Sequence, residues 1–413
     1  MKMRENSKLA LVATLALVIV LVGCSSAPAV APTEKKVIKL GMSVALSGAM
    51  AKEGNYCKDG VEFWSKKVAE RGGIEVGDET YDVEVIYYDD KSDAETSAKL
   101  TEKLITEDKV DFLIGPFNSG LAMLTTTVGE KYNKITMCTM SNSSEIFNRG
   151  YKYAFAVLPP AGNYMRLFLD MAMAQDPKPE TVAVVMRDDP FGISMAGGTA
   201  EYARELGLEV VYEQKYPKDI KDASALLTDI KALDPDIVIG CTNLQDAVLI
   251  TRQAKELDVC PQALAYSVGP TMPGFVESLG DDAEYVYGSE WWLPQMGWKG
   301  RGIFESSQAF AEEFEAEYGY KPSYHPAGSA AAAEILRLCI EDTDSLDTEV
   351  LRECLLDFDE EIFWGPQAFA PNGENRKGGS APVQIQGLEV RSVYPAEIAQ
   401  ETPVWPMPCW DER

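Results

Sequence analysis

Two segments of this chain concentrate side chains that could bind a small polar solute. In residues 113–120 an apolar stretch leads into Ser119 and Gly120, and in residues 139–144 the hydroxyl and amide groups include Ser141 and Asn142. Where such a segment opens a helix, free backbone N–H groups and hydroxyls can together hold a carboxylate. A simple helix N-cap is the alternative for Ser119, whereas the second segment carries more polar groups than one cap needs.

The residues that catalysis usually requires are scarce. His325 is the single histidine and precedes an expected helix, and the sequence has no Gly-x-Ser-x-Gly elbow, phosphate loop, dinucleotide fingerprint or Cys-x-x-Cys pair. Carboxylate pairs such as Asp188 and Asp189 are expected at solvated turns of an acidic protein. We therefore predict a protein that is not an enzyme and needs no cofactor or metal.

The N-terminus has the pattern of a lipoprotein signal peptide. Three basic residues lie within residues 2–8, an apolar run spans residues 9–22, and Cys24 follows. The run is shorter than the roughly 20 residues of a membrane-spanning helix. We predict residues 1–23 as the signal peptide, Cys24 as the lipidated residue and residues 24–36 as its tether. An ordinary secretory signal or an uncleaved anchor is the alternative.

The chain is strongly acidic, with a formal net charge of −27. Because the signal peptide carries three basic residues and one acidic residue, its removal leaves about −29. Such a charge repels phosphate backbones, so we expect no nucleic-acid partner, and any membrane attachment would come from the lipid. The roughly 375 residues that remain exceed what one hydrophobic core usually organises, which predicts two lobes.

Short β-branched runs alternate with amphipathic stretches along the mature chain. Expected strands span residues 37–42, 83–87, 110–114, 135–138, 181–186, 208–212, 236–240 and 262–266. Expected helices span residues 60–70, 194–206, 223–233, 244–257, 304–318 and 326–340, and a capping box at residues 92–95 opens another. Repeated strand-helix units imply an α/β fold with two doubly wound parallel sheets, which bind ligands at the C-terminal ends of their strands.

The chain has eight cysteines, Cys24 included, without metal-type spacing. Cys339 and Cys354 lie in two successive expected helices, where an oxidising compartment could join them; free thiols are the alternative. Cys241 and Cys260 would lie at opposite ends of a parallel sheet, so we expect both to be buried free thiols.

Six short motifs follow one another along nearly the whole mature chain. They are Gly48 with Lys52-Glu53-Gly54, Asp89-Asp90, Ile114 to Gly120, Arg149-Gly150-Tyr151, Asp189-Pro190-Phe191-Gly192 and Arg252-Gln253-Ala254. Together they resemble the leucine/isoleucine/valine-binding family, the type I substrate-binding proteins of branched-chain amino-acid ABC transporters. The resemblance implies the type I periplasmic-binding-protein fold, with two lobes on a three-segment hinge that close on a ligand. It implies lobe 1 from residues 37–159 plus 294–380 and lobe 2 from residues 160–293 plus 381–413.

The resemblance also implies roles for particular positions. Ser119 and the backbone beside it correspond to the family's carboxylate site, and Ser141 and Asn142 to a loop that contacts both the α-carboxylate and the α-ammonium. Phe191 corresponds to an aromatic residue of the second lobe that covers the ligand, and Asn243 or Leu244 falls near another contact.

Two positions depart from the family pattern. The acid that pairs with the ligand ammonium falls at Ser267, and a position near the mouth that often holds an aromatic residue has Glu53. A buried ammonium without a carboxylate partner costs several kcal/mol, so either another acid supplies the charge or the ligand lacks an ammonium. Glu290, near an expected crossover, is a candidate replacement. Trp292 beside it either lines an aromatic pocket or packs in the hinge.

The resemblance implies an exported receptor, lipid-anchored at the outer face of the cytoplasmic membrane or located in the periplasm. It would capture a branched-chain type of amino acid, or a related small carboxylate, and deliver it to an ABC permease and ATPase complex. An amide or urea, which would suit Asn142 and Ser267, and an aromatic acid are alternative ligands. A ligand-sensing receptor subunit is the alternative function.

Overall fold

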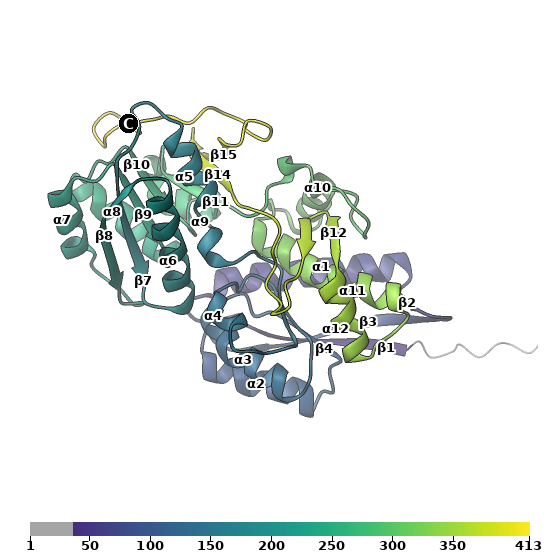
Figure 1. Ribbon diagram of the computed structural model, residues 1–413. Coiled ribbons are helices and arrows are strands. Elements are labelled where there is room, and N and C mark those ends of the chain that lie inside the picture. The colour runs from purple at the N-terminus through teal and green to yellow at the C-terminus, as the bar shows by residue number, and fades with distance from the viewer. Residues whose placement is uncertain (1–35) are drawn as a thin grey trace, which may run out of the picture. The chain divides into compact units, whose positions relative to one another are not determined.

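The computed structural model describes residues 36–413, and Figure 1 shows its strands gathered into two main sheets. The first sheet contains β1 (Lys36–Val44), β2 (Ile74–Val76), β3 (Glu79–Asp89), β4 (Phe112–Ile114), β5 (Thr136–Cys138) and β6 (Ala154–Ala156). Its order is β2-β3-β1-β4-β5-β6, and each neighbouring pair is parallel except β2 with β3. The predicted parallel sheet is therefore confirmed.

The second sheet continues the same strand-helix alternation. It contains β7 (Thr181–Arg187), β8 (Glu209–Tyr216), β9 (Ile237–Cys241), β10 (Ala263–Tyr266), β11 (Tyr287–Glu290), β14 (Ala381–Gln386) and β15 (Glu389–Ser392). The order is β15-β14-β11-β10-β9-β7-β8, parallel from β8 to β11 and antiparallel at β14 and β15. A separate hairpin pairs β12 (Asp359–Ile362) with β13 (Gly365–Ala368). The sequence predicted the parallel part and not the antiparallel edge.

Helices cover both faces of each sheet. On the first sheet, α1 (Ala51–Arg71) and α11 (Tyr324–Thr343) lie on one face, and α2 (Ala94–Thr106) and α3 (Ser119–Lys131) lie on the other (Figure 1). On the second, α5 (Arg166–Met173) and α6 (Pro190–Glu205) lie opposite α7 (Ser224–Leu233) and α8 (Leu244–Glu256). The remaining helices are α4 (Ser144–Phe147), α9 (Pro273–Leu279), α10 (Ser307–Tyr318) and α12 (Thr348–Asp357), with 3-10 turns at η1 (Ala161–Asn163), η2 (Gly280–Ala283) and η3 (Pro294–Met296).

Helix α1 begins nine residues before the predicted start at Gly60. Two glycines inside the helix weaken the sequence signal, because glycine is a poor helix former. Both glycines are required by close packing. A Cβ atom at Gly54 would collide with the Ala45 carbonyl, and one at Gly60 would collide with the backbone of Pro326 in α11. By contrast, the helix start predicted at residues 92–95 is confirmed, with Asp93 as the N-cap accepting the Thr96 amide at 2.8 Å. The predicted capping box is wrong, because the Ser92 hydroxyl bonds instead to the backbone of Ser47 and Met50.

The chain crosses between the two sheets three times, after β6, after β11 and before β14. One hydrogen-bonded cluster links these three crossover segments to one another. The Ser380 hydroxyl donates to the Tyr164 carbonyl at 2.5 Å, and the Ser289 hydroxyl donates to the same carbonyl at 3.0 Å. The two hydroxyls lie 2.9 Å apart. The predicted three-segment hinge is therefore present. The lobe boundaries implied by the family, at residues 159, 293 and 380, stay a prediction.

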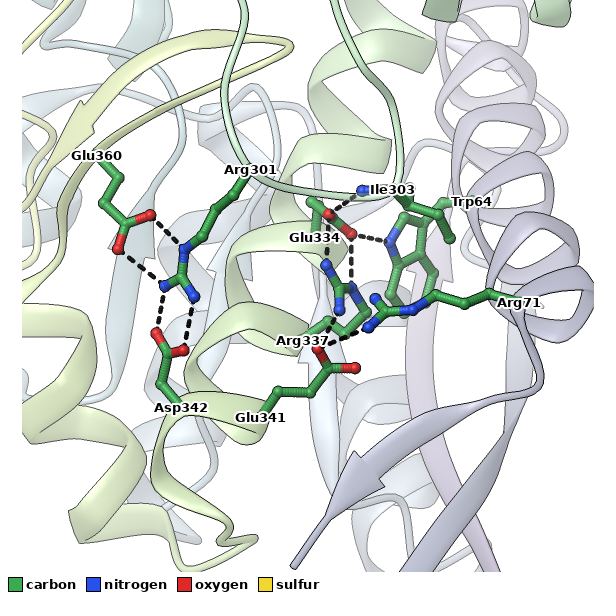
Figure 2. Close-up of polar contacts among 9 residues, drawn as sticks. All are labelled: Trp64, Arg71, Arg301, Ile303, Glu334, Arg337, Glu341, Asp342 and Glu360. Atoms are coloured by element: carbon green, nitrogen blue, oxygen red, sulfur yellow. Dashed lines mark hydrogen bonds and ion pairs between the residues drawn. The ribbon is translucent and has the colours of Figure 1, made fainter.

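A buried ion pair fixes α11 against α1 and the segment that precedes α10 (Figure 2). Glu334 and Arg337 are almost fully buried, and the Glu334 carboxylate accepts two hydrogen bonds from the Arg337 guanidinium at 2.8 and 3.0 Å. It also accepts the Trp64 indole N–H at 2.8 Å and the Ile303 amide at 2.7 Å. One carboxylate thus satisfies donors from three separate segments.

Two disulfides join positions 15 and 149 residues apart in the described chain. Cys339 in α11 and Cys354 in α12 form the bridge that the sequence left open. The prediction of a free thiol at Cys260 is wrong, because Cys260 pairs with Cys409 at a Cα separation of 5.5 Å. The C-terminal segment makes this possible by returning to the second sheet, where the Trp410 indole N–H donates to a nearby backbone carbonyl at 2.8 Å. Cys241 is a buried free thiol, as predicted.

The N-terminal predictions, including lipidation at Cys24, lie outside the described residues. Between residues 36 and 413, no helix has the length and apolar character needed to cross a membrane.

Candidate ligand-binding site

A cavity lies where loops that follow strands of both sheets meet. Its empty volume is about 460 Å³, counting the space that opens to solvent. The wall consists of Met50, Glu53, Phe117, Asn118, Ser119, Met140, Leu158, Tyr164, Phe191, Asn243, Val268, Tyr324 and His325. Most of these follow the C-terminal ends of parallel strands, where doubly wound sheets bind their ligands.

Ser119 lies in the cavity wall at the first position of α3. It is not the N-cap, because the preceding Asn118 side chain accepts the amides of Gly120 at 2.8 Å and Leu121 at 3.3 Å. The Ser119 hydroxyl instead accepts the amides of Asn142 and Ser143 at 3.3 and 3.2 Å. It thereby joins the loops after β4 and β5, and its hydroxyl proton stays available for a ligand acceptor.

The other predicted polar residues of these two loops, Ser141 and Asn142, bond to backbone carbonyls and do not line the cavity. The Ser141 hydroxyl donates to the Pro116 carbonyl at 2.9 Å, and the Asn142 side-chain Nδ2 donates to the Pro159 carbonyl at 2.6 Å. Neither residue lines the cavity, nor does Gly120, whose amide is held by the Asn118 side chain. The Asn142 Oδ1 atom is buried and has no hydrogen-bond donor within residues 36–413.

The second sheet contributes an aromatic wall. Phe191 lies in the first turn of α6, where the Asp189 side chain caps the helix by accepting the Gly192 amide at 2.8 Å. The Phe191 ring lies 6.1 Å from the ring of Tyr164, which in turn lies 4.8 Å from the Trp291 ring. These edge-on contacts are the preferred geometry for aromatic pairs.

Asn243 and Ser267 follow neighbouring strands of the second sheet but differ in their contacts. Asn243 precedes α8 and lines the cavity, with no side-chain cap bond to that helix. Ser267 is fully buried, and its hydroxyl accepts the Thr242 amide at 3.1 Å and donates to the Thr242 carbonyl at 3.2 Å. Ser267 therefore joins the ends of β9 and β10 and does not reach the cavity wall.

The two candidate acids lie in different places. Glu53 lies in the first turn of α1, lines the cavity and is 8% exposed, and burial raises the pKa of its carboxyl. Glu290 ends β11 and is 2% exposed; its side chain is not part of the wall. Burial raises the pKa of Glu290 to about 8, so this carboxyl is mostly neutral at pH 7.

Trp292 has the contacts of a packing residue. Its indole N–H donates to the Phe363 carbonyl at 3.1 Å, and its ring stacks on Trp364 with the centroids 6.3 Å apart. Trp292 is 1% exposed and does not line the cavity. The packing alternative considered from the sequence is the one that the contacts favour.

Several wall residues have no clear signal in the sequence. His325 was expected only at a helix start, and it lies there as the second residue of α11. It also reaches the cavity, because α11 packs tightly against α1 beside Gly60. Burial lowers the pKa of His325 to about 3, so its ring is neutral. Within the described part of the chain, no cluster of side chains is suited to hold a metal ion.

The sequence matches the model of a family described as periplasmic binding protein over residues 37–387. The chain belongs to this family. This periplasmic binding protein is 24% identical over 382 residues to the Leu/Ile/Val-binding protein homolog 7 of Brucella melitensis, covering 88% of this chain and 92% of that protein. It is also 24% identical over 384 residues to homolog 8 of Brucella abortus, covering 88% of this chain and 91% of that protein.

Solved structures share the fold of this periplasmic binding protein. The leucine-binding protein LivK of Thermotoga maritima is 19% identical with a TM-score of 0.76, covering 86% of this chain and 97% of that one. A solute-binding protein of R. palustris in complex with benzoate is 19% identical with a TM-score of 0.73, covering 90% of this chain and 99% of that one. The predicted type I periplasmic-binding-protein fold is thus confirmed.

Proposed function

We propose that this protein is the substrate-binding component of an ABC importer and that it captures an amino acid of the branched-chain type. One observation carries the proposal. A cavity lies at the strand ends of both sheets and combines the start of α3 and Ser119 with a mainly apolar and aromatic wall. Amide and hydroxyl donors suit an α-carboxylate, and the apolar wall suits a hydrocarbon side chain.

The relatives agree with this proposal. Two of them are named Leu/Ile/Val-binding protein homologs, and a protein of the same fold from Streptococcus pneumoniae is described in complex with isoleucine. In the proposed mechanism the ligand contacts both lobes and shifts an open-closed equilibrium toward the closed form, which the permease recognises. The protein itself catalyses no reaction.

An aromatic acid is a second candidate ligand, because Phe117, Tyr164, Phe191 and Tyr324 all line the cavity. The R. palustris protein in complex with benzoate has the same fold. Calorimetric titration of the mature protein with leucine, isoleucine, valine, benzoate and a short amide separates the candidates. We expect saturable binding of at least one of the three amino acids; binding of benzoate or the amide alone would refute the proposal.

We also propose that the protein is exported and held at the membrane by a lipid on Cys24. The motif around Cys24 supports lipidation, and the disulfides at Cys339 and Cys260 fit an oxidising compartment. Expression with labelled palmitate should label the wild-type protein and not Cys24→Ser. Equal labelling of the two proteins would contradict lipidation at this residue.

A further inference from the structure

Glu53 is a buried acid without an ion-pair partner among residues 36–413. Its side chain lines the ligand cavity at 8% exposure. Within residues 36–413 its carboxylate forms no ion pair, and the hydrogen bond that favours its charged form comes from its own backbone amide. Burying an ionised carboxylate without a partner costs several kcal/mol, so a group that supplies positive charge would stabilise this arrangement.

The two cations that act most on Glu53 each have an acidic partner elsewhere, and Lys218 and Lys221 line only an adjoining cavity. Lys52 and Arg187 are the cations whose charge lowers the pKa of Glu53. The Lys52 ammonium lies 3.6 Å from the Glu277 carboxylate. The Arg187 guanidinium lies 2.8 Å from Asp189 and 2.7 Å from Asp246.

In the described chain, Glu53 supplies the one carboxyl group of the cavity wall. No lysine or arginine lines the cavity in the described chain, and the neutral His325 adds no charge. A ligand carboxylate near Glu53 would be repelled, whereas an ammonium would be attracted. The position at which the family places its acid holds Ser267, which does not line the cavity, and Glu290 is not in the wall either.

We propose that Glu53 binds the ammonium group of the ligand and that the site therefore prefers a carboxylate that carries an amine over the same carboxylate without one. The proposal rests on the proposed function, since it names the group that completes amino-acid recognition in the same cavity. Glu53, Met50 and Asn243 also line the adjoining cavity. The acid thus lies between the two cavities.

The test compares three probes that differ in one group: leucine, 4-methylpentanoate, which lacks the amine, and 3-methylbutylamine, which lacks the carboxylate. Each is titrated by calorimetry into the wild-type protein, Glu53→Gln and Glu70→Gln. Glu70 lies on the exposed side of the same helix, so its replacement makes the same change in net charge. Circular dichroism and thermal melting confirm that each variant is folded.

We expect the wild-type protein to prefer leucine to 4-methylpentanoate. Glu53→Gln should bind leucine about 30-fold or more weakly, as expected for removal of one partner of a buried charge pair. It should bind 4-methylpentanoate equally or more tightly, and Glu70→Gln should match the wild type. Rescue of carboxylate binding distinguishes charge recognition from general damage to the cavity, which would weaken both ligands.

The outcomes separate this proposal from the proposed function. Leucine bound equally by the wild type and Glu53→Gln would overturn the role of Glu53 and leave the amino-acid receptor intact. Preference of the wild type for 4-methylpentanoate over leucine would overturn it as well. If the wild type does not bind leucine, the branched-chain assignment fails. If the wild type then binds 3-methylbutylamine more tightly than 4-methylpentanoate, and Glu53→Gln abolishes this preference, the role of Glu53 is still supported. Absence of this preference in the wild type would overturn that role.

Discussion

Replacing Glu290 by glutamine should stabilise the protein at neutral and alkaline pH and leave its stability almost unchanged in acid. Glu290 is 2% exposed at the end of β11, and its Oε1 atom accepts the Trp291 amide at 2.9 Å. Burial raises its pKa to about 8. Glutamine has nearly the same shape and does not ionise. In the variant, the unfolded chain therefore gains no free energy by releasing a proton from this side chain.

The size of the effect follows from the two pKa values of Glu290. Below its ordinary pKa of 4.5 the carboxyl is protonated in the folded and the unfolded chain. Between pH 4.5 and 8 the unfolded chain releases the proton and the folded chain keeps it, so the free energy of unfolding falls by about 1.4 kcal/mol per pH unit. The loss is about 3 kcal/mol at pH 7 and about 5 kcal/mol above pH 8. The neighbouring Tyr164 and Tyr324 do not titrate in this range, because burial raises their pKa values well above 10.

Urea denaturation monitored by tryptophan fluorescence measures this difference between about pH 4.5 and 8.5. Glu397→Gln is the matched control, because Glu397 is an exposed glutamate of the C-terminal segment. The difference in unfolding free energy between Glu290→Gln and wild type should grow by about 5 kcal/mol across the range, while the control stays flat. A difference for Glu290→Gln that changes by less than about 1 kcal/mol would refute the buried, protonated carboxyl.

Three further changes test the packing and the site. Arg337→Met should lower the free energy of unfolding by about 3–5 kcal/mol, because it leaves the buried Glu334 carboxylate without its cationic partner. Adding Glu334→Gln, which removes the charge and keeps an acceptor oxygen for the Trp64 or Ile303 N–H, should recover part of this loss in urea titrations, and no recovery would contradict the explanation. Replacing Cys339 and Cys354 together by serine should lower the free energy of unfolding by about 3 kcal/mol, since their bridge spans 15 residues. An unchanged melting temperature would argue against the bridge. Ser119→Ala should weaken leucine binding about tenfold in calorimetry, and an unchanged affinity would place the ligand carboxylate elsewhere.

Local patterns in the sequence were sufficient to predict most of the fold. Runs of β-branched residues such as Thr181 to Met186 predict strands because they are buried on both faces, and β7 spans Thr181–Arg187. The start of α2 was predicted from the polar run at residues 92–95, although the side chain that caps the helix is that of Asp93. The early start of α1 was missed because Gly54 lowers helix propensity and is required only by packing against Ala45.

Some of the predicted site residues line the cavity and others do not. The outcome depends on whether strand topology alone places the residue or whether the direction of its side chain decides. Ser119, Phe191 and Asn243 follow parallel strands, so the topology alone brings them to one cavity. Asn142 and Ser267 follow strands too, but their polar groups bind neighbouring backbone. Sequence patterns indicate where a loop lies and do not show which way its side chains point.

Other parts of the site depend on contacts between segments that lie far apart in the sequence. Tyr324 and His325 reach the cavity because α11 packs on α1, which no local pattern reports. The bridge between Cys260 and Cys409 joins residues 149 positions apart, through a C-terminal segment with no regular element of its own. The sequence therefore showed that seven cysteines follow Cys24 but not which of them pair.

A crystal structure of the mature protein with leucine tests the central claim most directly. We predict leucine in the cavity, with its carboxylate bonded to Ser119 or to amides of the first turn of α3 and its ammonium beside Glu53. Its hydrocarbon side chain should lie against the aromatic wall that includes Phe191. Leucine bound outside this cavity, or with its carboxylate turned away from α3, would contradict the account.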